Sequence, residues 1–69
     1  MVRLLGIDLP KNKRIEYALT YIHGIGLTSA KKIVQLAEIN SETRTDDITT
    51  EQSVALRNIL ENFELNKFF

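Results

Sequence analysis

The sequence predicts a small all-α domain of three short helices. Apolar residues recur with the period of a helix in three separate stretches of the 69-residue chain. No stretch alternates with the two-residue period of a strand for long enough to predict a sheet. Glycine, asparagine and polar residues separate the three stretches. We therefore expect residues 1–69 to form one domain in which three amphipathic helices share a single core.

The first helix is expected to begin after Asn12, which follows Pro10 and can cap a helix N-terminus. Its apolar residues stand at i, i+3, i+4 and i+7, which places them on one face. They are Ile15, Ala18, Leu19 and Ile22. Gly24 is expected to end this helix.

The second helix is expected to begin at Thr28 as its N-cap and to stop at Asn40. Its apolar face repeats the spacing of the first helix. The residues of this face are Ala30, Ile33, Val34 and Ala37. The polar residues 40–48 have no regular period and predict a loop.

The third helix is marked by Thr49 and Gln52, which have the spacing of a capping box. Its apolar face is formed by Leu56, Ile59, Leu60 and Phe63. Each of the three helices thus has one apolar face to bury, which is consistent with one shared core.

Composition excludes several classes of function. The chain has no cysteine, so disulfides and cysteine-ligated zinc or iron–sulfur sites are excluded. His23 is the only histidine and has no evident orienting partner, so we interpret it as a turn residue rather than a catalytic base. Asp46 and Asp47 precede a helix, where acidic groups are favourable without any metal. We therefore expect a protein without catalytic residues, metal or cofactor.

The apolar run from Leu4 to Ile7 is interrupted by Asp8 and is far too short to be a signal peptide or to cross a membrane. We accordingly expect no membrane association. A 69-residue chain buries only ~60% of the surface that it exposes when unfolded, so its own stability should be low.

The net charge is zero, but the charge is distributed unevenly. Residues 1–37 carry six basic and two acidic groups, whereas residues 38–69 carry three basic and seven acidic groups. Any surface that binds phosphate is therefore expected in the first half of the chain.

The connection between the first two helices resembles a helix-hairpin-helix motif with a Gly-Ile-Gly turn, Gly24 to Gly26. Glycine permits positive φ and close approach of the backbone to a phosphate, and a helix N-terminus adds free N–H groups. Thr28 and Ser29 offer hydroxyl groups, and Lys31 and Lys32 offer charge. The alternative is a plain turn between helices, in which the glycines have no role in binding.

A second basic cluster, Lys11, Lys13 and Arg14, lies just before the first helix. Such a cluster is usually a solvated charge run. However, basic groups at the start of a helix oppose its dipole, and a nearby anion would offset this cost.

A long ordered set of residues is shared with a known ribosomal family. The set comprises Gly6-Ile7-Asp8-Leu9-Pro10-Lys11-Asn12-Lys13-Arg14, Ala18-Leu19-Thr20-Tyr21-Ile22, Gly24-Ile25-Gly26, Ala30, Asn40, Thr43-Arg44, Asp47-Ile48-Thr49 and Leu56-Arg57. In this set the chain resembles the S-thirteen family of small ribosomal subunit proteins. The resemblance covers almost the whole chain and is more specific than the hairpin motif alone.

This resemblance implies a helix-two-turns-helix domain in the head of the small subunit, bound to small-subunit rRNA beside another head protein. It also implies contact with a protein of the large subunit's central protuberance, which contributes to contacts between the subunits during translation. The rRNA-binding residues that it implies are Lys11, Lys13, Arg14, Gly24, Gly26, Thr28, Ser29, Lys31 and Lys32.

The family pattern differs at the end of the chain. Family members continue after a Gly-Asp-Leu-Arg-Arg segment into another helix and a very basic tail directed toward transfer RNA, whereas this sequence ends at Phe69. Residues 1–69 are thus expected to be the N-terminal half of the family's full length. A fragment, a split gene and a shortened protein all remain open as explanations.

The abundance of Ile, Asn and Lys suggests an AT-rich coding sequence, for which we favour a plastid over a bacterial cytoplasm or a mitochondrion. Two other functions remain open. One is a DNA-binding helix-hairpin-helix accessory subunit, because phosphate binding alone does not distinguish DNA from RNA. The other is a protein-interaction module that uses the acidic second half and the apolar end of the chain.

Overall fold

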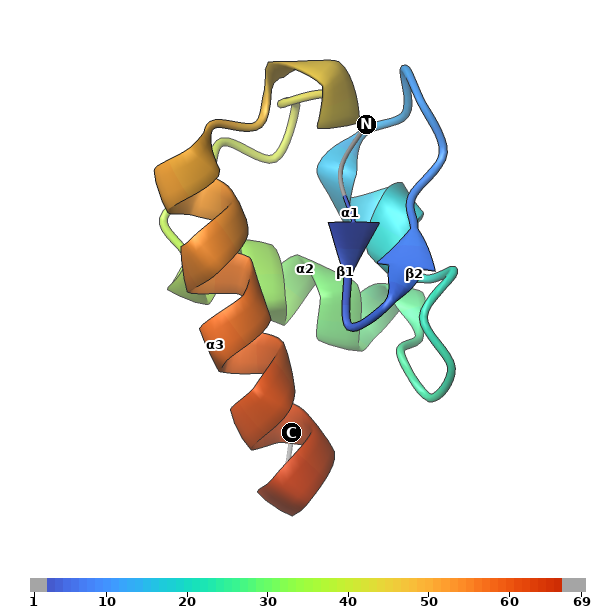
Figure 1. Cartoon of the computed structure of the whole chain (residues 1–69), viewed down its shortest axis with the longest axis vertical. Coiled ribbons are helices and arrows are strands. Elements are labelled where there is room, and N and C mark those ends of the chain that lie inside the picture. The colour runs from blue at the N-terminus through green and yellow to red at the C-terminus, as the bar shows by residue number, and fades with distance from the viewer. Residues whose placement is uncertain (1–2, 67–69) are drawn as a thin grey trace.

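The computed structural model describes residues 3–66, with side chains described for residues 3–62. The elements in this part of the chain are β1 (Arg3–Leu4), β2 (Ile7–Asp8), α1 (Ile15–Leu19), α2 (Leu27–Leu36), the 3-10 helix η1 (Thr45–Asp47) and α3 (Thr50–Asn66). Figure 1 shows α2 running across the long helix α3, with α1 and the two short strands on the same side of α3. The described residues therefore form a small, mostly helical domain, as the sequence predicts.

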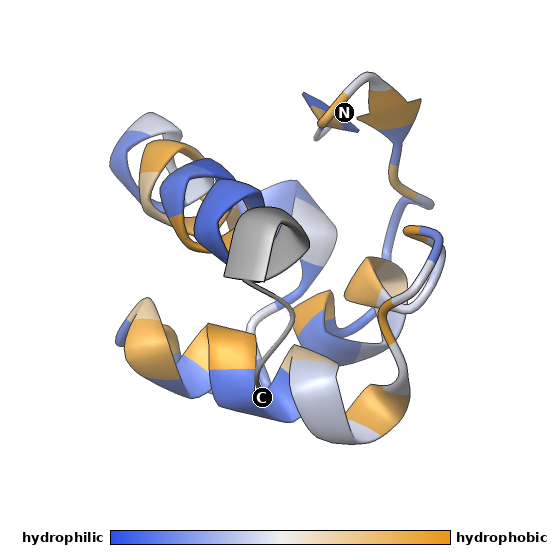
Figure 2. Ribbon diagram, turned by 90° about the horizontal axis from the view of Figure 1, so that it is seen from below, coloured by the Kyte–Doolittle hydropathy of each residue, from blue (hydrophilic) through white to orange (hydrophobic). Residues whose placement is uncertain are grey.

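One hydrophobic core joins the three α-helices and the two strands. Figure 2 shows that the hydrophobic side of α2 is turned toward α3 and that its hydrophilic side is turned away. The buried residues are Leu4, Leu9, Ile15, Ala18, Leu19, Ile22, Ile25, Ala30, Ile33, Val34, Ile39, Leu56 and Leu60. The apolar faces predicted for the first two helices are confirmed, except that Ala37 is only partly buried. In α3, Leu56 and Leu60 are buried and Ile59 is partly buried, whereas the side chain of Phe63 lies outside the described residues.

The expectation of a fold without any sheet is wrong, because β1 and β2 form a two-stranded antiparallel sheet. Each strand has only two residues, which is too short for an alternating pattern to be visible in the sequence. Leu5 and Gly6 connect them with φ angles of 52° and 77°. Positive φ at both central residues is typical of the type I′ hairpin turn, and Gly6 adopts it without strain. The hairpin directs Leu4 into the core.

The first helix begins later than predicted. Arg14 is the N-cap of α1, whereas Asn12 has a φ of 55° and so cannot be part of a helix. The helix ends at Leu19, and the chain continues in tighter turns. In these turns the N–H of Tyr21 donates to the carbonyl of Ala18 at 3.1 Å.

Both ends of the second helix also differ from the prediction. Gly26, not Thr28, is the N-cap of α2. The helix ends at Leu36, before Asn40, because Glu38 adopts a φ of 58°. The N–H of Ile39 then donates to the carbonyl of Val34 at 3.1 Å, which is the closing bond of a Schellman motif.

The polar segment 40–48 is more ordered than the predicted loop, since it contains η1. The capping box that follows it is confirmed. The N–H of Thr49 donates to Oε1 of Gln52 at 3.0 Å, and the N–H of Gln52 donates to Oγ1 of Thr49 at 3.1 Å. These reciprocal bonds fix the start of α3.

Candidate nucleic-acid interface

The turn before α2 uses its two glycines differently. Gly24 has a φ of 87°, and the N–H of Ile25 donates to the carbonyl of Ile22 at 3.0 Å. This is the geometry of a turn that requires positive φ at its third residue, which explains glycine at this position. Gly26 has an ordinary φ of −87°. The expectation of positive φ therefore applies to Gly24 alone, and Ile25 between the glycines is buried in the core.

The start of α2 is open to an approaching anion. The N–H groups of Leu27, Thr28 and Ser29 have no acceptor among the described residues, and no acidic residue lies in the first turn of α2. A Cβ atom added at Gly24 or Gly26 would meet no atom of the protein within 4 Å, apart from the neighbouring residues of the chain. A small side chain at Gly26 would therefore begin in open space, where a bound molecule could be hindered by it.

Side chains of α2 continue this surface. A hollow of about 470 Å³ is lined by Thr28, Ser29, Lys31, Lys32 and Gln35. We call the free N–H groups of residues 27–29, together with Thr28, Ser29, Lys31 and Lys32, the α2 cradle. Its hydroxyl and ammonium groups are the types that bind phosphate oxygens.

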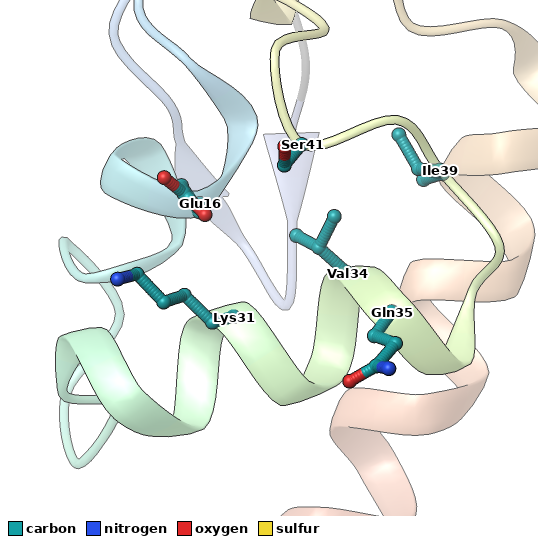
Figure 3. A pocket seen from close by; sticks show the side chains of 6 residues that line it. All are labelled: Glu16, Lys31, Val34, Gln35, Ile39 and Ser41. Carbon is teal, nitrogen blue, oxygen red and sulfur yellow. The ribbon is translucent and has the colours of Figure 1, made fainter.

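Lys31 is shared with a second hollow. Figure 3 shows Lys31 of α2 and Glu16 of α1 directed into the same space, with Val34 beside them. Glu16 is only 7% exposed. Its carboxylate therefore lowers the positive potential on one side of the α2 cradle.

Lys13 and Arg14 belong to a different surface, which is held together by backbone hydrogen bonds to residues about thirty positions later. The N–H of Thr45 donates to the carbonyl of Lys13, and the N–H of Ile15 donates to the carbonyl of Thr43, both at 2.8 Å. Arg14 and Arg44 stand opposite each other in this antiparallel bridge. Arg44 is thereby placed beside the two basic residues that precede α1.

Side-chain bonds reinforce the same junction. Thr45 is buried, and its hydroxyl donates to the carbonyl of Pro10 at 2.8 Å. Arg44 donates from Nη1 to the carbonyl of Asn12 at 3.2 Å, and the N–H of Asn12 donates to Oδ1 of Asp46 at 3.3 Å. These bonds join residues 10–12 to residues 44–46. The side chains of Lys13, Arg14 and Arg44 therefore project from a backbone that is held in place on both sides.

A groove lies next to this junction. Its lining consists of Lys13, Arg14, Tyr17, Thr20, Tyr21 and Arg44. We call it the α1 groove. The nine predicted site residues thus do not form one surface. Four of them lie in the α2 cradle, and Lys13 and Arg14 lie in the α1 groove. Gly24 and Gly26 lie in the turn before α2, and the exposed Lys11 lines neither hollow.

Figure 1 shows residues 22–26 at the lower right of the molecule and residues 10–14 at the top, beside η1. Arg44, from the second half of the chain, lines the α1 groove beside Lys13 and Arg14, so the basic groups of this groove do not come from the first half alone. Sequence reasoning also missed Tyr17 and Tyr21. Their separation by four positions was the available signal, because such residues share a helix face.

No helix in residues 3–66 is long and apolar enough to span a membrane.

Comparison with known proteins gives the family. Residues 3–69 match the Ribosomal protein S13/S18 family. The chain belongs to this family. It is 80% identical over 66 residues to small ribosomal subunit protein uS13c of Thalassiosira pseudonana, a match that covers 96% of this chain and 54% of the relative. The corresponding protein of Trieres chinensis is 73% identical over the same shares of both chains.

A bacterial relative, small ribosomal subunit protein uS13 of Corynebacterium kroppenstedtii, is 54% identical over 61 residues, covering 88% of this chain and 50% of the relative. The chain spans about half the length of the relatives that it matches. These relatives are named as small ribosomal subunit proteins, so the family to which this chain belongs is one of small-subunit ribosomal proteins.

Proposed function

We propose that this chain is a structural, non-enzymatic part of the small ribosomal subunit that binds the phosphate backbone of rRNA through the α2 cradle. The observation that carries this proposal is the open start of α2, where three N–H groups have no acceptor within the described part of the chain. They lie next to Thr28, Ser29, Lys31 and Lys32. Free N–H groups at the positive end of a helix favour a bound phosphate, and the lysines add charge.

The position in the ribosome is part of the same proposal. We place the chain in the head of the small subunit, beside another head protein and in contact with a protein of the large subunit's central protuberance. The relatives support the ribosome, since their names are those of small-subunit proteins. The identities of 80% and 73% to proteins named uS13c support a plastid ribosome over a bacterial one.

The finer description of the fold also belongs here. The positive φ of Gly24, the buried Ile25 and the N-cap Gly26 support a helix-hairpin-helix-like turn within a helix-two-turns-helix domain. In this turn Gly26 contributes space for the ligand rather than an unusual backbone conformation.

Gly26→Ser tests the cradle. Serine is at least as good an N-cap as glycine and meets no protein atom, so we expect the stability to be unchanged or slightly higher. Its side chain would occupy the space in front of the free N–H groups and cap one of them. We therefore expect affinity for a transcript of the small-subunit head rRNA to fall, measured by fluorescence anisotropy with circular dichroism on the same sample.

The matched control is Arg57→Gln, which removes one exposed positive charge from α3, away from both surfaces. It should change the affinity little. If Gly26→Ser stays helical and keeps full affinity, the backbone does not contribute to binding. Equal affinity for a DNA duplex of the same sequence would instead support the DNA-binding alternative.

A further inference from the structure

We propose that the α1 groove binds unpaired nucleotides of RNA, with bases stacked on Tyr17 and Tyr21 and phosphates held by Lys13, Arg14 and Arg44. This inference rests on the proposed function only for the choice of RNA as ligand. It concerns a different surface from the α2 cradle. The chemistry also differs, because bases stack on aromatic rings, and the α2 cradle contains none.

The two tyrosines supply the stacking surface. Tyr17 is 45% exposed and Tyr21 is 60% exposed. The chain has few aromatic residues, and these two are not used to fill its core. They stand four positions apart and line the same groove. The hydroxyl of Thr20, between them, donates to the carbonyl of Tyr17 at 2.6 Å and so is already bonded to the backbone. The rings are therefore the principal groups that the groove offers to a base.

The three basic residues supply the phosphate contacts. No carboxylate among the described residues forms an ion pair with Lys13, Arg14 or Arg44. Arg44 uses Nη1 for the carbonyl of Asn12, which orients its guanidinium and leaves further N–H donors for a ligand. The groove thus holds three positive charges without an ion-pair partner among those residues.

The opposition of Arg14 and Arg44 points to the sign of the ligand. Like charges that face each other across an antiparallel pair destabilise the pair. Here the backbone bonds at Lys13 and Ile15 hold the two arginines on adjacent segments regardless of this repulsion. A bound phosphate would relieve it, and a cationic or purely apolar partner would not.

Unpaired rather than paired RNA fits the groove. In a duplex the base faces are stacked on one another and cannot contact a tyrosine ring. Exposed aromatic rings between basic side chains are the usual combination in proteins that bind single strands. An acidic peptide would match the charge, but it would gain nothing from ring faces suited to a flat base.

Intrinsic fluorescence gives a direct test. The chain has two tyrosines and no tryptophan, so its tyrosine emission comes from Tyr17 and Tyr21 alone. We would titrate the 69-residue chain with a short oligouridylate, with a blunt-ended RNA duplex of equal phosphate number and with polyglutamate, monitoring helicity in parallel. We expect saturable quenching by the single strand and little quenching by the other two.

Variants separate stacking from charge. Tyr17→Leu and Tyr21→Leu should each weaken binding of oligouridylate by about tenfold without changing its salt dependence. Arg44→Gln should reduce the slope of log affinity against log salt by about 0.7, the value for one phosphate of a single strand. Tyr17→Phe keeps an aromatic ring, so this variant should bind oligouridylate as tightly as the parent chain. Its tyrosine fluorescence then comes from Tyr21 alone.

Each outcome has one interpretation. Unchanged affinity in the doubly substituted Tyr17→Leu, Tyr21→Leu chain, with helicity retained, would overturn the stacking proposal even if rRNA still binds. If the leucine variants lose helicity, unquenched emission of the Tyr17→Phe and Tyr21→Phe variants at saturating oligouridylate would overturn it equally. Polyglutamate binding as tight as oligouridylate would make the groove a protein contact. Absence of any RNA binding by the parent chain would instead defeat the proposed function.

Discussion

The α2 cradle and the α1 groove both present basic side chains, but the chain builds them in different ways. The cradle is formed by residues 27–32, which follow one another around the start of a single helix. The groove requires Arg44 and Thr45 to pair with residues 10–15. The comparison teaches that a site made from one local segment survives as long as its helix forms, whereas a site made from distant segments depends on the whole fold.

The largest effect is expected where both surfaces fail together. Leu56 is fully buried in the core, so Leu56→Ala should lower the free energy of unfolding by about 2–5 kcal/mol. In so small a domain this loss should unfold much of the free chain. RNA that binds the folded form would restore helicity, since a ligand at a hundredfold its Kd stabilises by ~2.7 kcal/mol.

Thermal unfolding followed by circular dichroism, with and without the head rRNA transcript, measures this effect. Val54→Ala on the exposed side of α3 is the control and should change the unfolding temperature little. A Leu56→Ala chain as stable as the parent would show that α3 is not needed to hold the fold.

The next effect should fall on the cradle alone. Reversing the charge of Lys31 and Lys32 to glutamate places two anions beside the proposed phosphate site, and we expect about a hundredfold weaker rRNA binding. The salt dependence should also decrease. The helix should remain, because both side chains are exposed and glutamate is a good helix former.

Anisotropy titrations at several salt concentrations would measure the change in this double variant. The α1 groove should retain its quenching by oligouridylate. Loss of that quenching in the same variant would show that the two surfaces are not separate.

A smaller effect should separate the groove from the cradle. Thr45→Val removes the hydroxyl that donates to the carbonyl of Pro10, at a cost of about 1–2 kcal/mol. Valine has a similar shape, so the core should stay filled. We expect local opening of residues 10–15, detected as faster amide exchange at Ile15, while amides within α2 keep their protection. Equal acceleration in both places would indicate that the domain opens as one unit.

The smallest effect concerns the two glycines. Gly24→Ala forces a left-handed φ on an L-residue and should cost about 1 kcal/mol of stability, because Gly24 has a φ of 87°. Gly26→Ala keeps an ordinary φ and should cost only the modest loss of a better N-cap. Urea unfolding of both variants measures the difference, and a larger loss for Gly26→Ala would contradict the turn geometry described here.

The same contrast explains which parts of the structure the sequence predicted. The helical faces and the capping box at Thr49 depend on neighbours within a few positions, and these predictions are confirmed. The start of α1 and the place of Arg44 depend on hydrogen bonds between residues about thirty positions apart, which no local pattern reveals. The β-hairpin was missed for a different reason, since two-residue strands carry no periodic signal.

For the candidate site, the residues of the α2 cradle were predicted because the glycines, hydroxyl groups and lysines stand in one short segment. Whether these residues bind rRNA remains a prediction. Tyr17 and Tyr21 were not selected, because their spacing of four positions indicates only a shared helix face and does not reveal that the fold brings Arg44 into the same groove.

The pairing of residues 10–15 with residues 43–46 has a consequence for the protein during its own synthesis. The segment of the α2 cradle is complete once residue 36 has left the exit tunnel, but the α1 groove cannot close before Thr45 has emerged. All residues of the α2 cradle therefore leave the tunnel before Arg44 and Thr45, which complete the α1 groove. Contacts with phosphate would then precede contacts with bases, so that a nascent chain could be retained near RNA before it selects an unpaired site.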